Sequence, residues 1–133
     1  MTYTCFDHNT RLMVFRRGPD IIRLALSAAY TDPPQTNIEL GPDNVTFESQ
    51  LFTTLNTLPS NNDNIIIDLL PVATIYLDNM WSFMIAKKRM LQPIVLVTQR
   101  QVAEAFADVG FSAHLRCFYT VADAAAYYDH ITL

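Results

Sequence analysis

Two hydrophobic periodicities alternate along the second half of the chain, and they predict alternating strands and helices. Residues 65–69 and 94–97 are short continuous apolar runs rich in β-branched side chains. Such runs are typical of parallel strands buried on both faces. Residues 116–119 predict a further short strand. The remaining segments place apolar residues three or four apart, which is typical of helices with one buried face. These predicted helices span residues 45–58, 78–91, 101–109 and 124–129.

The N-terminal part of the chain predicts a pair of antiparallel strands. Residues 11–16 and 21–26 are apolar stretches joined by residues 17–20, which contain a glycine and a proline and therefore favour a turn. Residues 31–43 are rich in proline and polar side chains, with a candidate extended stretch at 38–40. They predict an inserted surface loop, whose role the sequence leaves open.

These elements together predict an α/β fold in one domain that spans residues 1–133. Because strands and helices alternate after residue 45, right-handed crossovers are expected to build a mixed, mostly parallel sheet. We expect about four or five strands, including the N-terminal antiparallel hairpin, and about four helices. A chain of this length buries roughly two thirds of its unfolded surface, so it can fold without a disulfide or a metal.

Charge and composition argue against several functional classes. The net charge is −4, and residues 1–60 (four basic, six acidic) and 61–133 (five basic, seven acidic) each carry −2. Neither half is therefore a basic surface for nucleic acid or anionic lipid. The apolar run at 65–75 is too short to span a bilayer and contains Asp68 and Pro71. The polar N-terminus does not resemble a signal peptide, so we expect a cytoplasmic protein.

The sequence lacks the residue patterns of common cofactor and metal sites. With three glycines in all, it has no glycine-rich phosphate loop. Cys5 and Cys117 lie far apart, and no CxxC or Cys/His spacing suits zinc or redox chemistry. His8, His114 and His130 are scattered. We therefore expect no cofactor, no metal and no enzymatic activity.

Asp68 raises two other possibilities. Its place at a strand end resembles the phosphate-accepting aspartate of receiver domains, but the acidic pair and the lysine which that site needs are missing. The other is a small-ligand-binding or catalytic α/β domain that uses the crevice at the carboxyl ends of the strands. A cavity lined by Asp68, Thr98 or Ser82 would favour it.

Residues 44–130 carry an ordered series of motifs. An apolar strand ends in Ile67-Asp68-Leu69, residues 76–81 open a helix, and residues 87–89 end it in basic side chains. A second apolar strand at 94–97, the pair Gly110-Phe111 and the helix start at 120–124 follow in order. In kind and spacing the series resembles the STAS domain, the fold of anti-sigma factor antagonists and of sulfate-transporter tails. Residues 10–30 resemble it more loosely.

The chain departs from the STAS pattern at the turn before the middle helix. Where the family has Asp-Ser-Ser/Thr-Gly, this chain has Tyr76-Leu77-Asp78-Asn79, so Asp78 takes the place of the phosphorylatable serine. In antagonists of that family a partner kinase phosphorylates the serine and switches binding off. Asp78 cannot accept phosphate from a serine kinase. The resemblance therefore implies a module that is not switched there.

Three residues of this turn have two interpretations each. Asp78 is either an ordinary helix N-cap or a fixed negative charge that mimics the phosphorylated state, and the two roles are compatible. Trp81 is either a half-buried packing residue or an exposed binding anchor. Tyr76 either covers the turn or contacts a partner.

The resemblance implies a non-enzymatic protein–protein interaction module in bacterial signalling and regulation. Its partner would be an ATP-binding anti-sigma kinase-like protein or another STAS-containing subunit. A homodimer through Trp81 or the edge hairpin is also open. The residues expected to bind the partner surround the turn and the start of the middle helix: Thr74, Tyr76, Asp78, Asn79, Met80 and Trp81.

Overall fold

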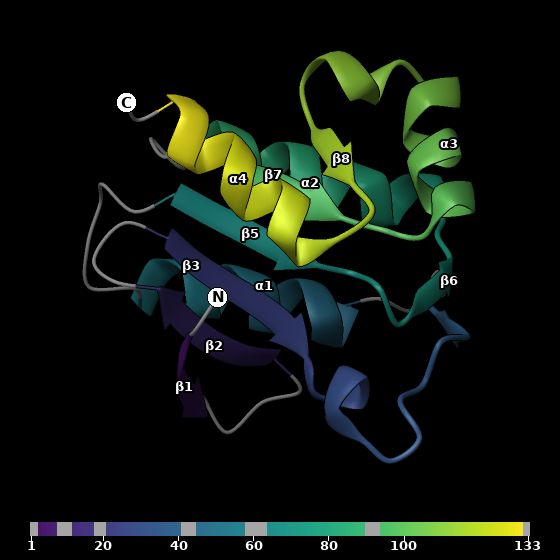
Figure 1. Ribbon diagram of the computed structural model, residues 1–133. Helices are drawn as coiled ribbons and strands as arrows, with labels where there is room; N and C mark the ends of the chain where they lie inside the picture. Colours follow the sequence, from purple (N-terminus) through teal and green to yellow (C-terminus); the bar gives the residue numbers. More distant parts are fainter. Residues whose placement is uncertain are drawn as a thin grey trace.

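A six-stranded mixed sheet with helices on both faces forms the centre of the protein (Figure 1). The computed structural model describes residues 3–7, 12–17, 21–40, 45–57, 64–89 and 94–131. The sheet has the strand order β1-β2-β3-β5-β7-β8. Its strands are β1 (Thr4–Asp7), β2 (Leu12–Arg17), β3 (Ile21–Leu26), β5 (Asn64–Asp68), β7 (Ile94–Val97) and β8 (Arg116–Phe118).

Four α-helices lie in the described part of the chain. They are α1 (Val45–Thr57), α2 (Leu77–Arg89), α3 (Arg100–Asp108) and α4 (Val121–Ile131). Two short 3₁₀ helices, η1 (Ser27–Tyr30) and η2 (Phe111–Ala113), follow β3 and α3. A small second sheet pairs β4 (Ile38–Glu39) with β6 (Val72–Thr74).

The strand directions agree with the predicted mixed sheet. β1, β2 and β3 pair antiparallel, whereas β3, β5, β7 and β8 pair parallel. In the middle of the parallel part, Ile67 lies opposite Leu24 on one side and Leu96 on the other. Each parallel strand therefore lies beside its predecessor in the chain, and one helix makes each crossover.

Two hydrophobic cores follow from the alternation of side chains along the strands. The larger core packs α1, α2 and α3 against one face of the sheet, with Leu24, Ile67 and Leu96 among its strand residues. The smaller core lies on the other face, where α4 covers Ile66 and Val95. Figure 1 shows α4 in front of β5 and β7, with α1 and α2 behind the sheet.

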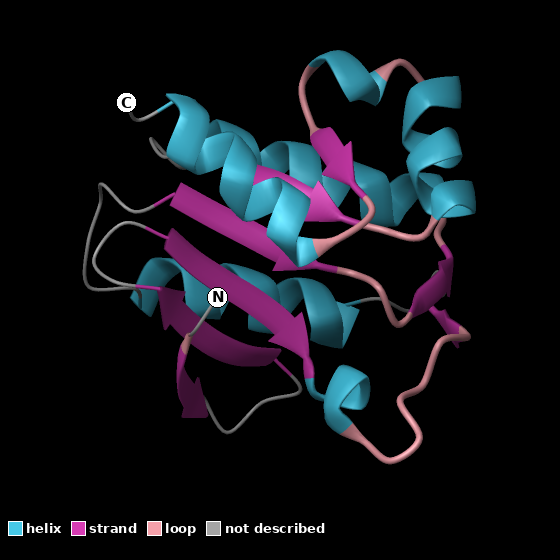
Figure 2. Cartoon of the chain, viewed as in Figure 1, coloured by secondary structure: helices cyan, strands magenta, loops and turns pink. Residues whose placement is uncertain are grey.

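The predicted inserted loop is described as far as Leu40, and it packs against the turn that follows β5. The Ile38 N–H donates to the Pro71 carbonyl (2.8 Å) and the Leu40 N–H donates to the Thr74 carbonyl (3.1 Å). Leu40 is buried in the larger core. In Figure 2 the loop runs from η1 to the two short strands β4 and β6 at the edge of the molecule. The loop thus supports the neighbouring turn.

The α/β fold class, the N-terminal hairpin and the parallel arrangement are confirmed. The strands β1 and β6 were not predicted, and with β1 the main sheet has six strands. β6 has three residues and depends on pairing with β4, which is distant in sequence. Parts of the predicted turn, loop and helix ends, at 18–20, 41–43, 58 and 90–91, lie outside the described residues.

Candidate functional site

The turn between β5 and α2 is held from two sides. At its start, the Leu69 N–H donates to the Val97 carbonyl (2.8 Å) and the Val72 N–H to the Leu69 carbonyl (2.9 Å). At its end, the Tyr76 hydroxyl donates to the Glu39 carboxylate in β4. This hydrogen bond and the negative charge of Glu39 raise the pKa of Tyr76 above its ordinary value. The predicted loop and the predicted binding turn therefore form one surface.

Asn79 caps the first turn of α2. The helix begins at Leu77, which makes Tyr76 the N-cap position and Asn79 the third helical residue. The Asn79 side-chain oxygen accepts the Tyr76 backbone N–H at 2.9 Å. This is the contact that the third residue of a capping box makes. Asn79 is buried, with 0% of its surface exposed. Its buried side-chain amide therefore stabilises the first turn of α2.

Asp78 is exposed in the first turn of α2, two positions beyond the N-cap site. Its carboxylate makes no hydrogen bond to any other residue in the described part of the chain. The N-cap interpretation of Asp78 is therefore wrong. A negative charge at the N-terminus of a helix is still stabilised by the helix dipole. Asp78 thus presents a solvent-exposed carboxylate at the head of α2.

An exposed apolar row runs along the outer face of α2. Leu77, Trp81 and Ile85 are 49%, 46% and 39% exposed. They are four residues apart, so they lie above one another on successive turns of the helix. We call these three residues the α2 row. Three large apolar side chains exposed side by side indicate an interaction surface more strongly than single ones do.

Trp81 rests on Phe111 from the segment after α3. The two rings meet edge to face, with 4.8 Å between their centroids and 69° between their planes. Gly110 allows this contact, because its left-handed backbone (φ 80°) redirects the chain from α3 into η2. Trp81 is thus both packed and partly exposed, and the two interpretations of it are compatible. A tryptophan held in this way is a rigid anchor.

Of the six residues predicted to bind a partner, four are exposed and two are buried. Thr74, Tyr76, Asp78 and Trp81 are exposed. Met80 is 5% exposed and belongs to the larger core, and Asn79 is fully buried. The prediction that these last two present surface to a partner is wrong, because Met80 packs into the larger core and the Asn79 side chain caps the start of α2.

Leu77, Ile85 and Glu39 also belong to this surface, although they were not among the residues predicted to bind a partner. The signal for the first two was present, since apolar residues at 77, 81 and 85 repeat every fourth position beside the core face. Glu39 carried no such signal, because its contact with Tyr76 joins segments that are distant in sequence.

Asp68 forms a buried ion pair. Its carboxylate accepts two hydrogen bonds from Arg23, at 2.5 Å and 3.1 Å, and a third from the Leu70 N–H at 3.0 Å. The guanidinium of Arg23 also lies over the rings of Phe15 and Tyr30, 5.3 Å and 5.6 Å from their centroids. Asp68 therefore joins β3 to β5 and stabilises the start of the turn.

The three residues proposed for a crevice at the strand ends are all buried. Ser82 is buried on α2 and donates to the Glu48 carboxylate of α1, on the side of the larger core. Asp68 pairs with Arg23, and Thr98 is fully buried beyond β7. The Gln99 side-chain amide donates to the carbonyls of Thr36 (2.8 Å) and Leu70 (2.7 Å), and so joins the loop to the turn across this edge.

Charge is unevenly distributed along α2. Asp78 is in its first turn, and Lys87, Lys88 and Arg89 are in its last. Both ends complement the helix dipole. The α2 row therefore runs from an acidic end to a basic end, which gives the surface a direction that a partner can recognise.

The described residues form no candidate metal site and no candidate membrane-spanning helix. Their His, Cys, Asp and Glu side chains nowhere form a group of three or more that could hold a metal ion. Of the helices that the structure describes, none has both the length and the apolar character needed to cross a bilayer. Comparison with protein-family models, with curated proteins and with solved structures finds no match to this chain.

Proposed function

We propose that this protein is a non-enzymatic interaction module that docks a regulatory protein through the outer face of α2. The observation that carries the proposal is the α2 row, three large apolar side chains exposed in line beside the carboxylate of Asp78. A mostly polar rim around an aromatic anchor is the usual composition of a docking surface. Tyr76 and Thr74 extend this surface toward the preceding turn.

The surface specifies the chemistry of its partner. The complementary site is an apolar groove that receives Trp81, with a basic side chain placed to meet Asp78. The contact with Phe111 holds the Trp81 ring before binding, and the Asn79 cap holds the helix start. Such preorganisation lowers the conformational entropy lost on association.

The resemblance to STAS domains narrows the partner further. It favours an ATP-binding anti-sigma kinase-like protein or another STAS-containing subunit, in the cytoplasm of a bacterium. Asp78 occupies the position of the family's phosphorylated serine and is exposed. Its permanent charge leaves no hydroxyl to modify, so serine phosphorylation does not switch binding at this position.

Affinity capture with matched baits tests the proposal. Wild-type protein and the variant Tyr119→Ala should retain the same partner from an extract of the source organism, and Trp81→Ala should lose it. Tyr119 is the matched control because it is an equally exposed aromatic residue (48%) outside the α2 row. The captured protein is then purified and titrated against all three baits. Equal affinity for wild type and Trp81→Ala would refute the proposal, as would the absence of any partner.

The charge of Asp78 is tested with the purified partner. Asp78→Asn keeps the shape of the side chain and removes its charge. If the charge meets a basic side chain, affinity falls about tenfold and the salt dependence of binding weakens. Asp78→Ser restores the hydroxyl that the family has at this position. Unchanged affinity in both variants would remove Asp78 from the docking surface and leave the α2 row in it.

A second copy of the chain is the other candidate partner, because the α2 row has opposite charges at its two ends. In an antiparallel α2 pair about a two-fold axis, Asp78 of one copy would face Lys88 of the other and Trp81 would face Ile85. Sedimentation velocity over a range of concentrations measures this association. Lys88→Asp should weaken it, and adding Asp78→Lys should restore it. A monomer at every concentration would exclude this candidate.

A further inference from the structure

A groove opens at the opposite end of the sheet from the binding turn. It lies at the amino ends of β7 and β8, where Ile94 and Arg116 begin these strands, and its volume is about 470 Å³. Side chains from the last turns of α2, from the segment around η2 and from α4 line it. Pockets of this size hold small organic molecules. The groove is separate from the crevice at the carboxyl ends of the strands.

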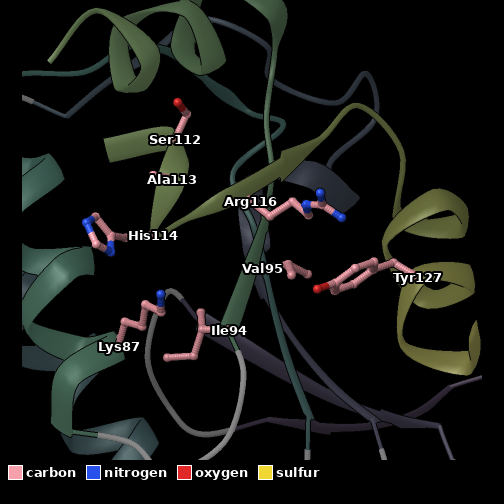
Figure 3. A pocket seen from close by; sticks show the side chains of 8 residues that line it. All are labelled: Lys87, Ile94, Val95, Ser112, Ala113, His114, Arg116 and Tyr127. Atoms are coloured by element: carbon pink, nitrogen blue, oxygen red, sulfur yellow. The ribbon is translucent and has the colours of Figure 1, made fainter. Parts of the chain in front are cut away.

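The polar side chains of the groove are cationic or neutral. Lys87, His114 and Arg116 line it together with Ser112 and Tyr127, and no carboxylate is among the lining residues that the structure describes. Figure 3 shows Lys87 and His114 on one side of the groove and Arg116 and Tyr127 on the other, with the Ser112 hydroxyl and the His114 ring turned outward. The chain as a whole carries a net charge of −4. The groove therefore has the opposite sign from the protein average and attracts anions.

Each side of the groove has an apolar part, and one side is preorganised. Figure 3 shows Ile94 on the side of Lys87 and Val95 beside Tyr127, because consecutive strand residues point to opposite faces of the sheet. The Arg116 guanidinium stacks over the Tyr127 ring, 4.9 Å from its centroid. A guanidinium stacked in this way keeps its N–H donors in its own plane, where they can bind an oxyanion in bidentate fashion.

We propose that this groove binds a small organic phosphate monoester. A phosphate monoester carries a charge of about −1.5 to −2 at neutral pH and has three acceptor oxygens, which matches the two fixed cations Lys87 and Arg116 better than a single carboxylate does. Val95 and the Tyr127 ring accommodate the organic group. The proposal goes beyond the docking function, because it concerns other residues at the other end of the sheet.

Backbone-amide NMR with phenyl phosphate as the probe tests the proposal at constant ionic strength. Saturable shifts should appear at residues 87, 94–95, 112–116 and 127. Phenol carries the ring without the anion and inorganic phosphate carries the anion without the ring, so both should bind at least about tenfold more weakly. The absence of saturation with phenyl phosphate, or shifts centred elsewhere, would overturn the proposal.

Two arginine variants make the test specific. Arg116→Gln should weaken phenyl phosphate binding about tenfold, because it removes one charged donor pair. Arg100→Gln is the matched control, since Arg100 also stacks on an aromatic ring (Tyr119, 5.1 Å) but does not line the groove. Lys87→Gln is a second variant in the groove, for use if Arg116→Gln perturbs the fold. Equal losses in the control and in the groove variants would show non-specific charge attraction and refute the site.

Discussion

Asp78 and Asn79 are neighbours in sequence and have different roles at the head of α2. Asn79 is buried and accepts the Tyr76 N–H, whereas Asp78 is exposed. We therefore predict that Asn79→Ala lowers the free energy of unfolding by about 1–2 kcal/mol, since it removes a cap and leaves the Tyr76 N–H without its acceptor. Asp78→Ala should cost less, about 0.3–1 kcal/mol, through the helix dipole.

Urea denaturation of the two variants, followed by circular dichroism, measures this difference. A larger loss in Asp78→Ala than in Asn79→Ala would contradict the assignment of the cap. The same pair separates stability from binding. Asp78→Ala should lower partner affinity more than it lowers stability. Asn79→Ala should lower stability more than it lowers partner affinity.

The two cysteines are expected to differ in reactivity. Cys5 is exposed, whereas Cys117 is partly buried, and burial raises the pKa of its thiol to about 11. The thiolate is the reactive form, so at pH 8 only about a thousandth of Cys117 can react. Below the pKa this fraction rises about tenfold per pH unit, so labelling of Cys117 should accelerate from pH 8 to pH 10.

Alkylation with iodoacetamide, followed by peptide mass spectrometry, checks this prediction. Cys5 should be modified first at pH 8, and Cys117 should approach it only in alkaline solution. Equally fast modification of both thiols at pH 8 would show that Cys117 is more accessible in solution than its packing indicates.

At the scale of elements, α4 is anchored to the sheet by one buried hydroxyl. Tyr128 is fully buried in the smaller core, and its hydroxyl donates to the Ile65 carbonyl of β5 at 2.8 Å. Tyr128→Phe keeps the ring and removes this donor, so we predict a loss of about 1–2 kcal/mol in the free energy of unfolding. Tyr119→Phe is the matched control and should change stability by less than about 0.5 kcal/mol, because Tyr119 is exposed. Equal effects in the two variants, measured by urea denaturation, would argue against the anchoring role.

Local patterns were sufficient to predict most elements but not how α2 is used. The apolar run 65–69 predicted β5 because a strand buried on both faces needs no polar alternation. The same reasoning located α2 to within a residue at its start. Met80 was predicted to bind a partner, although helical spacing places it on the core side of α2, and it packs into the larger core. A helical pattern identifies the buried face of a helix. It does not identify which exposed residues beside that face bind a partner.

At the scale of the whole molecule, the contacts that carry no local sequence signal join distant segments. The Tyr76–Glu39 hydrogen bond connects the inserted loop to the turn, and the Gln99 side chain hydrogen-bonds to both of these segments. The basic groove assembles Lys87 and Arg116 from two different elements. None of these residues forms a local motif, and their proximity follows only from the register of the strands and the packing of helices upon them. Local periodicity is informative about elements, whereas sites depend on tertiary arrangement.

Trp81 is the only tryptophan in the chain, so its fluorescence reports on the proposed docking surface directly. It is 46% exposed and rests on Phe111, so acrylamide should quench it less than free tryptophan and more than a buried one. Partner binding through the α2 row should reduce quenching and shift the emission to shorter wavelengths, because the exposed part of the ring enters an apolar groove. Self-association would produce the same change as the concentration of the protein rises. Ile85→Ser keeps the fluorophore and weakens the row, so it should diminish the protection in either case. Full quenching in the presence of a bound partner would place the interface elsewhere on the molecule.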